Sequence, residues 1–370
     1  MKLDVITRVK RLSHDQKNSN KYNKNMRRLF PQLFQLESIQ SHLRWMSKKR
    51  VLKQDILLLS SPPNTFARNV ALTFTEINNL PVEFVSLTSD TTESDLKTRR
   101  DLENQCVKFT DQAPVRAALQ GKVLILDGLE KCERNVLPTL NNLLENREMN
   151  LDDGRLLVSY ERYQSLLKIT PEEVLTQSGI LPTHPNFFVI ALTYPVPPYV
   201  GRTLDPPLRS RFQVRRLDFP SPGELISLGF NESVIKMCST LNAASNSDHK
   251  LFPRIPDLNI LILSKLLENY QGIDLLPVLK RTYPWIESDI KFHRKDAILK
   301  ILEANQTNVL QSAIPKKISM NIKLQAEDKL PFNRLKVLEN MLQDNEINRD
   351  ILLCGPIGSG KSCKFDNKLK

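Results

Sequence analysis

Short apolar runs separated by helical stretches constrain the fold of this chain more than any other feature. Each run is too short for a core helix, is rich in Leu, Val or Ile, and ends beside polar or turn-forming residues. Strands that alternate with helices predict an α/β fold in which a parallel sheet is wrapped by helices. The predicted strands are 55–60, 82–87, 121–127 and 186–192, and the helices before and between them are 36–49, 70–77 and 135–146.

The pattern changes after Pro220. Residues 221–310 carry apolar side chains at helical spacing with little strand signal, which predicts a small helical lid domain. Near the C-terminus a helix, a short polar link and the strand 350–354 repeat the order found around 55–58, about 295 residues earlier. We therefore expect four parts: a segment 1–35, an α/β core 36–220, a lid 221–310, and a linker with the start of a second, truncated module in 311–370.

Charge is concentrated at the N-terminus. Of the formal net charge of +12, residues 1–54 account for +11, with 14 lysines and arginines against 3 acidic residues. The folded core is therefore nearly neutral, which argues against a specific nucleic-acid partner. Residues 1–35 read either as a solvated basic tail or as a transit peptide. No apolar run is long enough to span a membrane, and the five scattered cysteines predict free thiols in a reducing compartment.

The segment from Gly355 to Ser362 matches the GxxxxGK[ST] phosphate loop at every fixed position and follows an apolar strand. In such a loop Gly355, Gly358, Ser359 and Gly360 let backbone N–H groups face phosphate oxygens. Lys361 contacts the β- and γ-phosphates of ATP, and Ser362 is a Mg²⁺ ligand. The motif is specific, but the chain ends eight residues later, before a second sheet could support it.

The first module has the expected order of strands and helices but lacks this motif. Its phosphate-loop position, Ser61 to Asn69, contains neither glycine nor lysine. Arg68 is the residue there that could supply charge to a nucleotide. The alternative is a helix N-terminus that has lost nucleotide binding.

The apolar strand 123–127 ends in Asp127, as does a Walker B strand whose acid holds Mg²⁺ through water. The residue after that aspartate is usually a glutamate that polarises the attacking water. Gly128 stands there, and Glu130 follows two residues later. An aspartate at the end of a strand also serves as a helix cap, so both roles stay open.

These segments resemble the MoxR/dynein-related branch of AAA+ ATPases. The resemblance rests on five stretches, 88–96, 118–130, 135–147, 153–155 and 205–212. The run from Ser41 to Phe212 also resembles the first module of the von Willebrand factor A domain-containing family. That resemblance implies a large, mitochondrial, multi-module protein; without it, a cytoplasmic location is the expectation.

The resemblance also implies residue roles. Arg211 corresponds to the arginine finger, with Arg209 as the second choice, and a finger stabilises charge on the ATP of a neighbouring module. At the sensor position, where the family has asparagine, this chain has Tyr194. The implied cofactors are ATP and Mg²⁺, and the implied partners are other AAA+ modules and a client protein.

Two functions remain. The family-level one is ATP binding and hydrolysis by a larger protein in which this first module is degenerate. The alternative is a hydrolysis-incompetent module that packs against active modules. A small-molecule kinase or GTPase that uses the loop at Gly355 is a more distant third.

Overall fold

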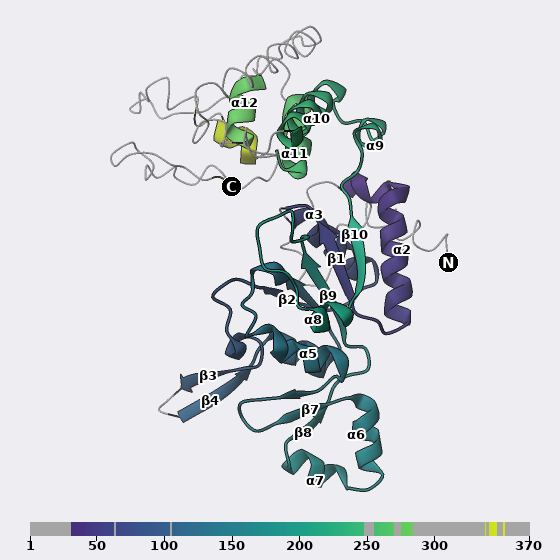
Figure 1. Ribbon diagram of the computed structural model, residues 1–370, viewed down its shortest axis with the longest axis vertical. Coiled ribbons are helices and arrows are strands. Elements are labelled where there is room, and N and C mark those ends of the chain that lie inside the picture. The colour runs from purple at the N-terminus through teal and green to yellow at the C-terminus, as the bar shows by residue number, and fades with distance from the viewer. Residues whose placement is uncertain are drawn as a thin grey trace, which may run out of the picture. The chain divides into compact units, whose positions relative to one another are not determined.

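The computed structural model describes residues 31–62, 64–103, 106–247, 255–269, 275–283, 337, 340–345 and 351 (Figure 1). The chain divides into two compact units, Met1–Leu228 and Gly229–Lys370. The first unit contains the sheets, and the described part of the second contains only helices. The predicted four-part division itself stays a prediction, because much of 1–35 and 284–370 lies outside the described residues.

A five-stranded parallel sheet forms the centre of the first unit, in the order β10-β1-β9-β5-β2. The predicted α/β fold with a parallel sheet and flanking helices is thereby confirmed. The five strands are β1 (Ile56–Ser60), β2 (Val82–Ser86), β5 (Val123–Asp127), β9 (Phe188–Thr193) and β10 (Gln213–Leu217).

The three inner strands are buried on both faces, which explains why their sequences are continuous apolar runs rather than alternating ones. One face, with Leu57, Leu124 and Val189, joins a core cluster with α4 and α5. Helix α3 contacts β1, β5 and β9. The helices that pack on the sheet are α3 (Thr65–Ile77), α4 (Ala113–Gln120) and α5 (Leu137–Glu145), and the short helices nearby are η2 (Glu93–Asp95) and η3 (Leu129–Lys131).

The edge strand β10 is missing from the sequence prediction. Its sequence, QVRRL, has two arginines and only two apolar residues. The structure explains them: α2 (Glu37–Val51) lies alongside β10 (Figure 1) and covers Arg215. The guanidinium carbon of Arg215 lies 5.3 Å from the centre of the Trp45 ring, and Arg215 Nε donates to His42 Nδ1 at 2.7 Å. A 3-10 helix, η1 (Pro31–Gln35), precedes α2.

Two insertions that the sequence did not predict extend from the core. The first is the antiparallel hairpin of β3 (Thr98–Glu103) and β4 (Cys106–Asp111). The second is a three-stranded sheet with two helices and its own small apolar cluster. Its elements are β6 (Met149–Asn150), β7 (Leu156–Val158), α6 (Tyr160–Leu167), α7 (Glu172–Gln177) and β8 (Ile180–Pro182).

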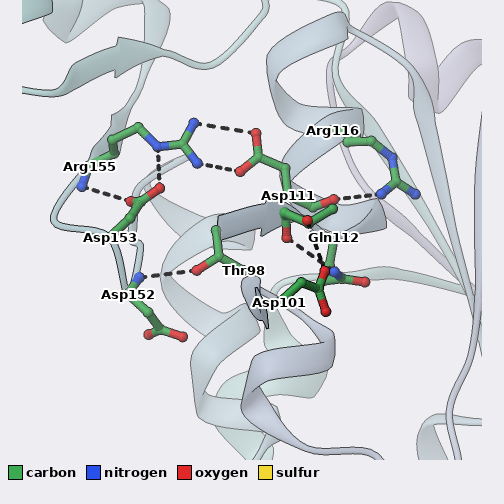
Figure 2. Close-up of polar contacts among 9 residues, drawn as sticks. Thr98, Asp101, Asp111, Gln112, Arg116, Asp152, Asp153 and Arg155 are labelled. Carbon is green, nitrogen blue, oxygen red and sulfur yellow. Dashed lines mark hydrogen bonds and ion pairs between the residues drawn. The ribbon is translucent and has the colours of Figure 1, made fainter. Parts of the chain in front are cut away.

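A polar network joins the base of the hairpin to the β6–β7 turn (Figure 2). Both terminal nitrogens of Arg155 contact the carboxylate of Asp111, and Arg155 Nε donates to Asp153 at 2.6 Å. Thr98 accepts from the backbone N–H of Asp152 at 3.3 Å. Arg116 on α4 donates to the backbone oxygen of Asp111 at 2.6 Å. The two insertions are therefore tied to each other and to α4.

The short helix α8 (Pro206–Ser210) lies between β9 and β10. After the sheet only helices follow among the described residues, as the helical spacing from 221 predicts. They are α9 (Pro222–Ser227), α10 (Glu232–Ser247), α11 (Asp257–Asn269) and α12 (Leu275–Thr282). In the second unit, buried Asn242 donates to the backbone oxygen of Ile255 and accepts from its N–H. This pairing fixes the chain entering α11. No helix within the described ranges is long and apolar enough to cross a membrane.

Candidate functional site

The carboxyl edge of the central sheet is the place where a ligand binds in folds of this kind. There β1 ends at Ser60, β5 at Asp127 and β9 at Thr193, and all three side chains are buried. Because β5 and β1 both pair with β9, the three strand ends lie side by side. The sequence-predicted Asp127, Arg68 and Glu130 all come from segments that begin at this edge.

The phosphate-loop position is a short connection rather than an open loop. Helix α3 begins at Thr65, so Arg68 and Asn69 already lie in its first turns. Without glycine the connection lacks the freedom that lets N–H groups surround a phosphate. Asn64 precedes the helix, is 7% exposed, and makes no side-chain cap. Its Nδ2 is buried without a hydrogen-bond partner among the described atoms.

Arg68 and Asp127 form an ion pair across this edge. Arg68 Nε donates to Asp127 Oδ2 at 2.8 Å, and Nη2 contacts the same oxygen. The Asp127 side chain is 4% exposed, whereas that of Arg68 is 42% exposed. The guanidinium also lies 5.5 Å from the centre of the Phe84 ring. A buried carboxylate needs a cation or hydrogen bonds, and Arg68 supplies both from within the chain.

Glu130 is separate from this pair. It lies in η3, is 1% exposed, and its Oε2 accepts from Thr193 Oγ1 at 2.7 Å. A Cβ on Gly201 would come within 3.2 Å of Glu130 Cγ, so the chain after β9 packs directly against this side chain. Burial raises the pKa of Tyr194, and the charge of Glu130 raises it further. Glu130 is therefore covered by protein and bonded to the end of β9, and its carboxylate makes no contact with the Arg68–Asp127 pair.

The predicted arginine finger lies at the opposite edge of the sheet. Arg211 precedes β10, whose first residue pairs with the first residue of β1. Its Nη2 contacts Glu145 at the end of α5. Arg209 is exposed, and within the described part of the chain no acidic group pairs with it. The structure thus keeps both arginines away from Asp127, as a residue acting on another module requires.

The predicted phosphate loop of the second module lies outside the described residues. Its predicted site residues are Gly355, Gly358, Ser359, Gly360, Lys361 and Ser362. Among the described residues, no group of three or more His, Cys, Asp or Glu side chains could hold a metal ion. The residues of the first module do not fit Mg²⁺–ATP, because the acid that would hold the metal is bonded to Arg68 and no glycine or lysine stands at the loop.

Comparison with known proteins finds one matching family model. Residues 64–212 match the model of the AAA domain, dynein-related subfamily. This part of the chain is therefore similar to the dynein-related AAA domain. The match begins at Asn64, directly before α3, and ends at Phe212, directly before β10.

A longer relative is also found. Over 249 residues the chain is 45% identical to von Willebrand factor A domain-containing protein 8 of Mus musculus. This alignment covers 66% of the chain but 13% of the relative.

Two solved structures resemble the chain at low sequence identity. One is the Holliday junction branch migration motor RuvB of Thermotoga maritima. Its identity is 16%, its TM-score is 0.37, and the match covers 72% of this chain and 68% of that one. The other is a protein of Cytophaga hutchinsonii described as a candidate ATPase. Its identity is 11%, its TM-score is 0.38, and the match covers 82% of this chain and 96% of that one.

Several contacting residues were not predicted from the sequence. Thr193 and Glu145 are not functional positions of any motif in the sequence. The structure identifies them because Thr193 bonds to Glu130 and Glu145 contacts Arg211. Asn64 was part of the altered loop, but nothing in the sequence indicated that its amide would be buried. Spacing along the chain could not reveal the Arg68–Asp127 pair, because 59 positions separate the two residues.

Proposed function

We propose that the first module is a hydrolysis-incompetent AAA module that packs as a structural unit beside ATP-hydrolysing modules of a longer protein. The ion pair between Arg68 and Asp127 carries this proposal. A Walker B aspartate works by holding Mg²⁺ through water, and here its carboxylate is bonded to a guanidinium supplied by the chain. The module therefore meets its own charge requirement without metal or nucleotide.

Three further changes support the same conclusion. The loop after β1 lacks glycine and lysine, so phosphate binding is weakened. Gly128 replaces the glutamate that polarises water, and Tyr194 replaces the asparagine that positions it. Each change removes a different requirement of phosphoryl transfer.

At the level of the longer protein we propose ATP binding and hydrolysis with Mg²⁺, in modules such as the one that begins at Gly355. The MoxR-type assembly, a mitochondrial location and a protein client belong to the same proposal. The family match supports the ATP-binding part of this proposal, and the coverage of the relative supports a longer protein. The MoxR-type assembly, the location and the client rest on the resemblance of the sequence alone. In a ring of modules, Arg211 or Arg209 would face the nucleotide of a neighbour.

The test is calorimetric titration of the 370-residue chain with Mg²⁺–ATP. Lys361→Ala is introduced first, so that the loop at Gly355 cannot account for binding. We expect no Mg²⁺-dependent binding in this background. Micromolar binding that Asp127→Ala abolishes would refute the proposal, because Asp127 would then be a working metal ligand. Asp218→Ala, which changes an aspartate outside this site whose side chain is 70% exposed, is the matched control for effects of the substitution itself.

A second candidate is nucleotide binding without hydrolysis. Two observations favour it: the Arg68 side chain is 42% exposed, and Asn64 Nδ2 is buried without a partner among the described atoms. Binding of metal-free ATP that Arg68→Ala abolishes and Asp127→Ala retains would identify this function. Absence of binding with and without Mg²⁺ leaves the structural role.

A further inference from the structure

The end of α2 and the turn after it form a small surface, Lys48 to Lys53, which we call the basic tip. Within α2 the apolar residues Ile39, Leu43 and Met46 are buried in the core. Val51 and Leu52 are not: their exposed fractions are 74% and 62%. Two large apolar side chains are therefore presented to solvent at the end of an otherwise amphipathic helix.

Cations surround this apolar pair. Lys48, Arg50 and Lys53 have no acidic partner among the described residues. Lys49 is engaged by the amide oxygens of Gln54 and Gln213, both at 2.9 Å. The helix C-terminus attracts positive charge within its last turn, which holds Lys48, Lys49 and Arg50, whereas Lys53 lies beyond the end of α2.

The acidic residue that follows the tip in the sequence is bonded elsewhere and does not pair with these cations. The next acidic residue along the chain, Asp55, is 3% exposed and bonded to Arg147. The tip also continues, along the sequence, a basic segment in which residues 1–54 carry a net charge of +11. The basic tip is thus both electropositive and apolar.

We propose that the basic tip docks on an anionic lipid surface. Exposed apolar side chains flanked by lysine and arginine are the pattern by which peripheral proteins contact membranes. Val51 and Leu52 would enter the headgroup boundary, and the flanking cations would contact lipid phosphates. Each cation near such a surface raises partitioning about fivefold, so three of them give about a hundredfold.

The apolar pair decides between this surface and other anionic partners. Contact with a nucleic-acid backbone needs the cations and gains little from exposed valine and leucine. A stable protein interface needs about 800 Å² on each side, whereas the apolar part of the tip is two side chains. A lipid surface needs no matching groove and uses both features at once.

The experiment is co-sedimentation of the 370-residue chain with phosphatidylcholine vesicles that contain about 30% phosphatidylglycerol, against pure phosphatidylcholine vesicles. The first variant is Val51→Ser/Leu52→Ser. The second is Lys48→Gln/Arg50→Gln/Lys53→Gln. The matched control, Val200→Ser/Ile169→Ser, changes apolar residues that are 93% and 84% exposed elsewhere.

We expect binding to the anionic vesicles only, lost at about 0.5 M salt because charge is screened. The apolar variant should lower partitioning about tenfold and the charge variant about a hundredfold, while the control binds as wild type. All variants should keep a melting temperature close to that of wild type, because the changed side chains are exposed, apart from half-buried Arg50, which has no acidic partner among the described residues.

The proposal is overturned if the chain binds no vesicles. It is also overturned if the apolar variant binds as tightly as wild type, since the binding would then belong to basic residues outside the tip. Tight binding of duplex DNA that the apolar variant leaves unchanged, without vesicle binding, would identify a nucleic-acid surface instead.

Discussion

Replacing Arg147 by methionine should destabilise the first unit strongly. Arg147 Nη1 donates to Asp55 Oδ2 at 2.7 Å, and Asp55 Oδ1 accepts from the N–H of Val189 at 2.9 Å. The two side chains are 21% and 1% exposed. The pair joins the end of α5, the start of β1 and the start of β9. Methionine is similar in length to the arginine stem, but it removes the guanidinium that lies 5.2 Å from the centre of the Phe187 ring and leaves a buried carboxylate without its cation.

Breaking a buried pair from one side costs about 3–5 kcal/mol. For a unit of this size each kcal/mol lowers the melting temperature by about 2–4 °C, so we expect a drop of about 10 °C. The control is Arg162→Met, which removes an ion pair to Glu148 in which the arginine is 56% exposed. That change should cost no more than about 1 kcal/mol.

The pH dependence makes the prediction sharper. Burial raises the pKa of Asp55, and Arg147 and the N–H of Val189 oppose that rise. Without Arg147 the folded-state pKa rises further above its unfolded value. A raised pKa means that stability is present at low pH and is lost as pH rises through the folded pKa. The deficit of Arg147→Met against wild type should therefore be largest at about pH 7.5 and shrink towards about pH 5.

Urea unfolding followed by circular dichroism at both pH values measures this deficit. Other titrating groups are common to the two proteins and cancel in the difference. An equal deficit at both pH values would show that Asp55 is not the group being compensated. A deficit as small as that of the control would refute the assignment of a buried pair.

Three further changes test other parts of the fold. Arg155→Ala should release the hairpin from the β6–β7 turn, so that trypsin cuts β3 and β4 several-fold faster while the melting temperature falls by only a few degrees. Burial, and then the charge of Arg215, lower the pKa of His42. The neutral ring therefore stabilises the fold above about pH 6.5, and this contribution is lost as pH falls below that value. His42→Gln removes the titrating group, so the melting temperature should change less than in wild type between about pH 7.5 and about pH 5.5. Gly121→Ala should cost more than Gly154→Ala in thermal unfolding. Both glycines have positive φ, but only at Gly121 would the new Cβ collide with a side chain, the ring of His184.

The sequence predicted the inner strands well because burial on both faces makes them continuous apolar runs. It also predicted α2 and α5 from their apolar spacing. β10 was missed because an edge strand that uses Arg215 to cover Trp45 has no apolar pattern to detect. The hairpin and the second insertion were missed for a related reason. Polar contacts such as Arg155 with Asp111 join them, and these leave no periodic signal along the chain. The strands of the second insertion are also only two or three residues long, too short for an alternating pattern.

The candidate site was predictable only in part. Motifs located Asp127, Arg68 and Glu130 at one edge, since the order of strands and loops fixes that edge. They could not say what each side chain would contact. Asp127 is paired with Arg68 and Glu130 with Thr193, and both pairings depend on which strands become neighbours in the sheet. The phosphate loop at Gly355 remains a prediction from its motif alone.

The ion pair at the carboxyl edge has a consequence for how such a module would respond in the cell. A guanidinium on the same chain is held at an effective concentration that a free ligand rarely exceeds. On the proposed function, changing levels of ATP or Mg²⁺ would leave the first module in one conformation. Modules that bind and hydrolyse nucleotide alternate between conformations, and the first module would remain in one conformation while its neighbours change. Loss of the phosphate loop would then have converted a nucleotide-dependent module into a static one.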